Sequence, residues 1–263
     1  MLLTRVLTAA VLLGAFLAAV LLLERQGFAV LVAGVIALGA FEWGRLAGFG
    51  PAASAGYAAA CVAGYGAVLD TAAVPFLLWA AALFWLAGVP WWLRAGVAPG
   101  RVSLALAGII VLVPAGLAMA SLSRTDLVCV LGLTWVADSA AYFAGRTWGQ
   151  RKLAPTVSPG KTWEGVAGGA VGCILYAIIW AVADSEFRGR VEGAFWIPLL
   201  AGTLLLSGLS VVGDLFESAL KRQAGAKDSG KLLPGHGGVL DRIDSATATL
   251  PVALLLLRAT GST

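Results

Sequence analysis

The chain has 263 residues, of which 60% are hydrophobic and only 12% are charged. Its mean hydropathy is +0.90 and its formal net charge is +4. These values exclude a soluble globular protein, which would need a far more polar surface at this length. They also exclude a nucleic-acid-binding protein, because the cations are scattered between apolar segments rather than gathered on one basic domain.

Long apolar stretches follow one another along the chain, and about 18 such residues suffice to cross a bilayer as a helix. We therefore expect an all-α, polytopic integral membrane protein with about nine transmembrane helices, at 5–23, 27–47, 53–69, 72–93, 102–120, 126–144, 165–183, 194–213 and 243–259. Eight helices are the alternative, because 53–69 is short and Pro90, Trp91 and Trp92 are typical of a membrane interface. A signal peptide is not favoured for the first stretch, which has no clean cleavage site before Glu24.

The distribution of positive charges predicts how these helices are oriented. With nine spans and an inside N-terminus, 13 of the 18 lysines and arginines lie in inside segments. The positive-inside rule then places two long polar segments, 145–164 and 214–242, on the cytoplasmic side. We expect a multi-pass protein of the cell (plasma) membrane whose active site faces the cytoplasm.

The two parts of the chain differ in polarity. Residues 1–120 carry almost no charge inside their spans, and we expect a transmembrane scaffold or an oligomer interface. Their Gly- and Ala-rich helices allow the close approach that a homodimer needs. Residues 121–263 form the expected catalytic region, with cytoplasmic loops 145–164 and 214–242. Cys61, Cys129 and Cys173 lie far apart in apolar runs, which indicates packing rather than a metal site or a disulfide.

The most polar segment of the chain is 218–244. It holds five of the 18 cations, the only histidine and three carboxylates. Placing a charge at the centre of a bilayer costs roughly 2.5–3.5 kcal/mol. Such a cluster therefore needs a function, and cations, acids and glycines at close spacing suit a metal-assisted reaction on phosphates.

Five carboxylates are candidate metal ligands. Asp214 and Glu217 are three residues apart and share one helix face, and Asp241 and Asp244 repeat this spacing. Asp138 lies within the sixth apolar stretch with no cation within seven residues, which favours a functional role. Oxygen ligands from three helices that converge near one interface would suit Mg²⁺. The alternative is that each acid pairs with a nearby cation or caps a helix, as Asp244 could do for the ninth helix.

Cations and glycines surround these acids. Five cations are suited to phosphate oxygens: Lys221, Arg222, Lys227, Lys231 and Arg242. Gly237 and Gly238 let the backbone approach an anion closely. His236, flanked by glycines on a loop, is expected to face a ligand rather than to pack in a core. An anchor for anionic lipids is the alternative, but it would need no acids, histidine or glycines among its cations.

A second polar loop, Ser158–Gly165, precedes the seventh span. It resembles a shortened phosphate loop but lacks the spacing of a P-loop and a preceding strand, so that assignment is rejected. We expect Ser158, Lys161 and Thr162 to contact phosphate. Glu164 either orients one of them or caps the helix.

The segment 218–244 resembles the signature of the phosphatidate cytidylyltransferases (CDP-diacylglycerol synthases). It contains the elements Ser-x-x-Lys-Arg, Lys-Asp, His-Gly-Gly and Asp-Arg-x-Asp without departure. Two further motifs of that family resemble Asp138 with Ala141-Tyr142 and Gly145-Arg146, and the loop from Ser158 to Gly165. The resemblance covers roughly residues 126–245, and the first half is similar only in hydropathy. Gly160 departs from the lysine that the family often has there, which puts the loop's share of phosphate binding in doubt.

This resemblance implies that CTP and phosphatidic acid give CDP-diacylglycerol and pyrophosphate in the presence of Mg²⁺. The implied catalytic residues are Asp214, Lys227, Asp228, His236 and Asp241, with Asp214 and Asp241 as the foremost metal ligands. Asp228 is either a ligand or the partner of a lysine.

Three alternatives to this reading remain. A cytidylyltransferase that acts on another lipid phosphate would have the same loops. An anion transporter is disfavoured, because the charges lie at span ends on one side. A non-catalytic lipid-binding relative is disfavoured by the intact acidic positions.

Overall fold

The computed structural model describes residues 2–96, 100–184, 189, 196–233, 235 and 237–259. Each of the nine expected segments contains a helix within this part of the chain, so the all-α architecture is confirmed. The helices are α1 (Leu2–Leu22), α2 (Arg25–Leu46), α3 (Pro51–Val68), α4 (Val74–Leu83) continued by a π-helical turn (Phe84–Gly88) and α5 (Val89–Ala95), α6 (Arg101–Ser121), α7 (Arg124–Trp148), α8 (Trp163–Ala183), α10 (Trp196–Gln223) and α11 (Leu240–Ala259).

Six helical segments of the described residues are long and apolar enough to cross a membrane. They are α2, the continuous segment Val74–Ala95, α6, α7, α8 and α10. Two of the other helices are less apolar than the expected spans, for different reasons. Alanine and glycine dominate α3, and α11 carries acids, serine and threonines.

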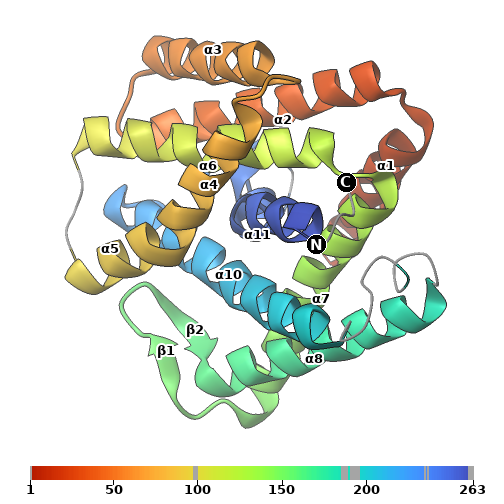
Figure 1. Ribbon diagram of the computed structural model, residues 1–263. Helices are drawn as coiled ribbons and strands as arrows, with labels where there is room; N and C mark the ends of the chain where they lie inside the picture. Colours follow the sequence, from red (N-terminus) through yellow and green to blue (C-terminus); the bar gives the residue numbers. More distant parts are fainter. Residues whose placement is uncertain are drawn as a thin grey trace.

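Helix α11 lies at the centre of the fold, seen end-on in Figure 1. It packs against α10, α6, α4, α7 and α2, and its residues 245–254 are all buried. Its hydroxyl groups bond to nearby carbonyl oxygens, as Thr249 does to Ser245 O (3.1 Å) and Ser245 to Ser210 O (3.2 Å). Because these polar groups are satisfied within the bundle, the helix can form the core without being strongly apolar.

Small residues allow the helices of the second half to approach closely. A Cβ atom at Gly168 of α8 would lie 2.2 Å from Cβ of Ala144 on α7. A Cβ atom at Gly213 of α10 would lie 2.7 Å from the carbonyl oxygen of Asp244 on α11. The glycine at position 213 therefore brings the next residue, Asp214, beside Asp244.

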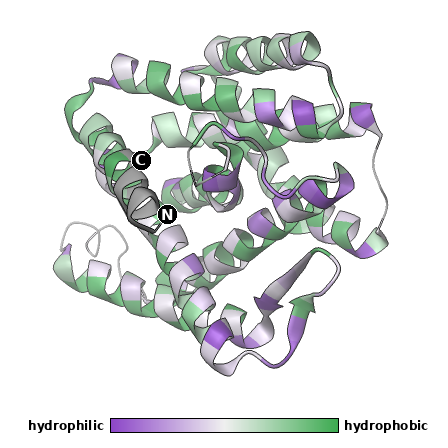
Figure 2. Cartoon of the chain, turned by 180° about the vertical axis from the view of Figure 1, so that it is seen from behind, coloured by the Kyte–Doolittle hydropathy of each residue, from purple (hydrophilic) through white to green (hydrophobic). Residues whose placement is uncertain are grey.

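The two segments expected to be cytoplasmic loops, 145–164 and 214–242, are partly helical. Helix α7 continues to Trp148, and the rest of 145–164 forms an antiparallel hairpin of β1 (Lys152–Ala154) and β2 (Ser158–Thr162). Helix α10 continues to Gln223: Phe216 and Leu220 are buried in the core, and Glu217 and Lys221 pair across one turn. Figure 2 shows that hydrophilic residues gather on the hairpin and on the loop that leads into α11.

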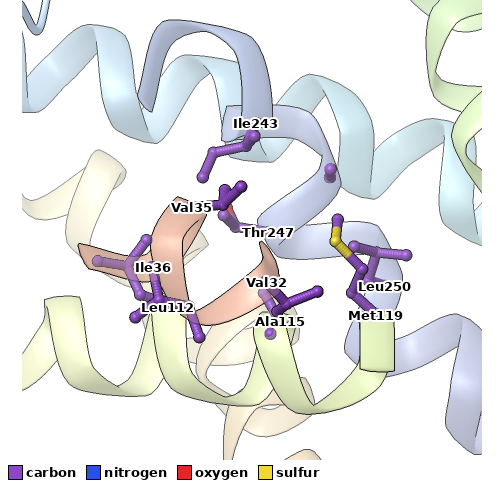
Figure 3. A pocket seen from close by; sticks show the side chains of 11 residues that line it. Val32, Val35, Ile36, Leu112, Ala115, Met119, Ile243, Thr247 and Leu250 are labelled. Atoms are coloured by element: carbon purple, nitrogen blue, oxygen red, sulfur yellow. The ribbon is translucent and has the colours of Figure 1, made fainter. Parts of the chain in front are cut away.

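An apolar crevice lies where α2, α6 and α11 meet (Figure 3). Val32 and Ile36 line it from α2, Leu112 and Met119 from α6, and Ile243 and Leu250 from α11. Thr247 is the one polar residue in its lining. The crevice is therefore part of the apolar packing between α2, α6 and α11, and not of the polar surface formed by the hairpin and the loop before α11.

Candidate functional site

The first polar cluster joins the hairpin to α10. Lys161, at the end of β2, places its Nζ 2.7 Å from Oδ2 of Asp214. The same ammonium group lies 3.5 Å from the carbonyl oxygen of Val211. Ser218, one turn along α10, donates its hydroxyl to Oδ1 of Asp214 (3.2 Å). The hairpin thus delivers a lysine to the acid that the sequence placed at the end of the eighth span.

The second polar cluster joins α10 to α11. The Nζ atom of Lys221 lies 2.5 Å from Oε2 of Glu217 and 2.6 Å from Oδ1 of Asp241. Glu217 is only 2% exposed. Its pairing with Lys221 lacks hydrogen-bond geometry, and neither carboxylate oxygen has a hydrogen-bond partner among the described residues. One ammonium group therefore faces two acids from two helices.

Asp241 is enclosed by the loop that precedes α11. Its Oδ2 accepts hydrogen bonds from the backbone N–H groups of Ser229 (2.9 Å) and Gly238 (2.8 Å) and contacts the Ser229 hydroxyl (2.9 Å). Burial opposes the charged form, but the hydrogen bonds from Lys221, Gly238 and Ser229 outweigh it and lower the pKa of Asp241 to about 2. Gly237 has φ +81°, and a Cβ atom there would lie 2.5 Å from Oδ2 of Asp241. A glycine is therefore required at this turn.

Three carboxylates from three helices converge beside these clusters. Asp138 of α7, Asp214 of α10 and Asp244 of α11 lie close enough to interact electrostatically. The hydroxyl of Ser210 donates to Oδ1 of Asp138 (3.3 Å). Lys161 pairs with Asp214 and also acts on Asp138.

The described residues contain no group of three or more His, Cys, Asp or Glu side chains already arranged as a metal centre. Three of the expected metal ligands instead form ion pairs with lysines: Asp214 pairs with Lys161, and Glu217 and Asp241 pair with Lys221. The donor chemistry nevertheless fits Mg²⁺, which uses few carboxylates together with substrate phosphates. A divalent cation would also relieve the mutual repulsion of Asp138, Asp214 and Asp244.

Several predicted phosphate-binding residues lie at the surface. Arg222 donates a hydrogen bond to the Ala226 carbonyl (3.4 Å), and Asp228 lies against Gly237. His236 lies outside the described residues. Five predicted site residues are exposed, on α10, on the loop that follows it and in the first turn of α11; they are Arg222, Lys227, Lys231, Arg242 and the predicted catalytic residue Asp228.

The residues of the Ser158–Gly165 loop have distinct structural positions. Thr162 is the N-cap of α8, where its hydroxyl accepts a hydrogen bond from the Gly165 N–H (3.1 Å). Glu164 accepts from the N–H groups of Gln150 and Arg151, both at 3.1 Å, and so fixes the hairpin to α8. Ser158 pairs with Ala154 across the hairpin. Of the loop residues, Lys161 is the one that the structure brings to the carboxylates, and phosphate contacts by Ser158 and Thr162 stay a prediction.

Sequence reasoning missed Glu42, which lies near the end of α2. Its Oε1 accepts a hydrogen bond from the Val239 N–H (3.0 Å), and its Oε2 accepts from the Leu240 N–H (2.8 Å) and the Ser229 hydroxyl (2.9 Å). Glu42 is an acid within an apolar stretch, as Asp138 is, but Arg45 lies three residues away and offers it an ordinary ion-pair partner in the sequence, so the signal that singled out Asp138 was absent. Helix α2 belongs to the expected scaffold, so the first half of the chain is joined to the site here.

Comparison with known proteins shows similarity along the whole chain. The model of the cytidylyltransferase family matches residues 3–260. A phosphatidate cytidylyltransferase of Pseudomonas aeruginosa is 44% identical over 281 aligned positions, which cover 99% of this chain and 98% of the relative. The expectation that the first half is similar only in hydropathy is therefore wrong.

Other relatives match one half. Phosphatidate cytidylyltransferases of Bacillus subtilis and Thermotoga maritima are 48% identical over 124 residues and 40% identical over 135 residues. These matches cover 47% and 51% of this chain and 44% and 49% of the respective relatives. The similarity to these two relatives is therefore confined to about half of the chain.

Proposed function

The chain belongs to the cytidylyltransferase family, and we propose that it transfers the cytidylyl group of CTP to phosphatidic acid at the site between β2, α10 and α11. The products are CDP-diacylglycerol and pyrophosphate, and the reaction uses Mg²⁺. Relatives named for this activity support the assignment. The observation that carries it is the arrangement of Lys221 between Glu217 and Asp241, beside the Lys161–Asp214 pair.

The chemistry requires two anions to meet. An oxygen of the phosphatidate monoester attacks the α-phosphorus of CTP, and the bond to the β-phosphate breaks as pyrophosphate leaves. The attacking oxygen is already ionised near neutral pH, so no general base is needed. Catalysis then consists of positioning and of stabilising charge on the phosphoryl oxygens.

The two partly buried lysines, Lys161 and Lys221, supply positive charge inside the site. Lys161 and Lys221 each face carboxylates in the structure, and we assign them to phosphate oxygens when substrates are bound. Their ammonium groups are flexible point charges, which suits an exchange between carboxylate and phosphate partners. Arg222, Lys227, Lys231 and Arg242 line the exposed approach and would hold the phosphates of CTP and the leaving pyrophosphate.

We assign Asp138, Asp214 and Asp244 to Mg²⁺, because their carboxylates converge from three helices. When bound there, the ion neutralises charge on the substrate phosphates. Asp241 and Glu217 are held by Lys221 in this structure. They become available as further ligands only when Lys221 turns to a phosphate.

The location of the site suits a lipid substrate and a soluble nucleotide. The acyl chains of phosphatidic acid remain in the bilayer beside the apolar helices, while its headgroup reaches the polar ends of α10 and α11. The bias of 13 in 18 cations toward one side places this end in the cytoplasm, where CTP is found. We propose that the protein resides in the cell membrane. A homodimer stays a prediction.

A direct assay tests this function. The purified protein in detergent is incubated with phosphatidic acid, labelled CTP and Mg²⁺, beside an Asp241→Asn variant and an Asp126→Asn control. Asp126 is a buried acid in the first turn of α7, far along that helix from Asp138. We expect labelled lipid from the wild type and the control but little from Asp241→Asn. No labelled lipid from folded wild-type protein would refute phosphatidate as the acceptor, and other lipid phosphates would then be tried.

A further inference from the structure

Glu42 is a buried acid on a helix of the first half whose hydrogen-bond donors all come from the catalytic segment. Its side chain is 6% exposed. Its three donors are the Val239 N–H, the Leu240 N–H and the Ser229 hydroxyl. Leu240 is the first residue of α11 and Val239 directly precedes it, at a helix end where backbone N–H groups lack partners within the helix. A carboxylate from α2 thus fills the role of an N-cap for α11.

Ser229 connects Glu42 to Asp241. Its hydroxyl oxygen lies 2.9 Å from Oε2 of Glu42 and 2.9 Å from Oδ2 of Asp241. A hydroxyl has one proton, so Ser229 donates to one of the two carboxylates at a time. The backbone N–H of the same serine donates to Asp241 (2.9 Å). The position of Ser229 therefore fixes both acids relative to each other.

Two glycines leave room for the carboxylate of Glu42. A Cβ atom at Gly230 would lie 2.3 Å from its Oε1. A Cβ atom at Gly238 would lie 2.3 Å from its Oε2 and equally close to the Ser229 hydroxyl. The loop that surrounds Asp241 is thus folded around Glu42 as tightly as around Asp241 itself.

We propose that Glu42 is a positioning residue for catalysis: it holds residues 229–230 and 237–240 in the conformation that positions Asp241, and Asp241 in turn positions the ammonium group of Lys221 for the substrate phosphates. Glu42 touches neither Asp241 nor Lys221 and acts through Ser229 and the first turn of α11. The proposal rests on the proposed function for its catalytic consequence, while the ordering of the loop is independent of any substrate.

The substitution Glu42→Gln tests the proposal with little change in size. The glutamine side chain has one acceptor oxygen and one NH₂ group. The NH₂ group would face the N–H groups of Val239 or Leu240 or the Ser229 hydroxyl, which are donors to Glu42, so at least one hydrogen bond is lost. We expect kcat with CTP and phosphatidic acid to fall about 10- to 100-fold, the range typical of partners that orient active-site ligands. Asp126→Asn is the matched control, because Asp126 is also buried and bonds to the Ser123 hydroxyl (2.6 Å) at the start of another helix.

Hydrogen exchange of the substrate-free protein supplies a readout that does not depend on activity. The amides of Val239 and Leu240 should exchange at least about 10-fold faster in Glu42→Gln than in the wild type, since they lose their acceptor. Asp126→Asn should leave them unchanged. The double variant Glu42→Gln/Ser229→Ala should lose less activity than the two single losses combined, because the two side chains share one hydrogen bond.

Three results would overturn the proposal. Unchanged exchange at Val239 and Leu240 would show that Glu42 does not order the loop. Faster exchange with kcat within about threefold of wild type would show that the ordering has no catalytic role. Equal losses of activity in Glu42→Gln and Asp126→Asn would indicate general destabilisation. If Glu42→Gln does not fold, Gly230→Ala takes its place, because a Cβ atom there would lie 2.3 Å from Oε1 of Glu42 and must displace that carboxylate; unchanged exchange and unchanged kcat in Gly230→Ala would overturn the proposal. An inactive wild type would refute the proposed function, and the exchange measurement would still stand.

Discussion

Lys221 and Asp241 lie on different helices, 20 residues apart in the chain, with Nζ and Oδ1 separated by 2.6 Å. This contact closes α10 onto the first turn of α11 and brings the loop between them over the site. The same ammonium group pairs with Glu217. The three side chains therefore act as one electrostatic unit, and the effect of changing one depends on the other two.

Removal of Lys221 should destabilise the protein, and the additional removal of Glu217 should restore only part of the lost stability. Lys221→Gln leaves Glu217 and Asp241 facing each other without a cation, and breaking a buried pair costs about 3–5 kcal/mol. Lys221→Gln/Glu217→Gln removes one of the stranded acids and should recover part of that loss. Thermal unfolding in detergent measures both, with the exposed Lys152→Gln as the control. A double variant no more stable than Lys221→Gln would contradict the shared role of the lysine.

Close packing at Gly213 should be needed for both stability and activity. Gly213→Ala forces its methyl group against the Asp244 carbonyl and should lower stability by about 1–3 kcal/mol while separating Asp214 from Asp244. Gly208 lies on the same helix with nothing within 4 Å of a Cβ atom there. Gly208→Ala should therefore be neutral or slightly stabilising. Unfolding midpoints and initial rates of the two variants distinguish them, and equal behaviour would rule out a specific contact at Gly213.

Activity should depend on Mg²⁺ through the converging carboxylates. EDTA should abolish product formation, and added Mg²⁺ should restore it. Asp138→Asn should raise the Mg²⁺ concentration needed for half-maximal rate about 10-fold or more, because it removes one of the oxygen ligands. Asp126→Asn, on the same helix, should leave this concentration unchanged. Full activity in EDTA would refute the metal assignment.

The hairpin should face the cytoplasm. Thr156 is exposed at the turn between β1 and β2, and Thr71 is exposed between α3 and α4. The charge bias places them on opposite sides of the membrane. In a background without the native cysteines, Thr156→Cys should react with a membrane-impermeant thiol reagent only in inside-out vesicles, and Thr71→Cys only in right-side-out vesicles. Labelling of both on the same side would show that the topology is wrong.

The helices could be predicted from the sequence because each apolar run has the length of a spanning helix. The extension of α10 to Gln223 was not predicted, since the continuous apolar run ends at Asp214, and the buried Leu215, Phe216 and Leu220 beyond it are interspersed with charged residues. The central position of α11 also escaped prediction, because a helix with acids and hydroxyls gives no sign that five other helices cover it.

The composition of the site was predictable, but its pairing was not. Motif spacing placed Asp214, Lys221 and Asp241 together. It could not show that Lys161 reaches Asp214 across 53 positions or that Glu42 reaches the loop from 187 positions away. Such contacts depend on how helices pack in three dimensions, which spacing within one helix does not record.

The central, weakly apolar helix α11 has a consequence for biosynthesis. Ribosomes make it after the helices that surround it, and its acids and hydroxyls make it a poor substrate for independent insertion into the bilayer. Its entry must then be driven by docking into a bundle that is already in place. Because Asp241 and Asp244 belong to α11, the cluster of acids and lysines between α10 and α11 is incomplete until α11 has docked.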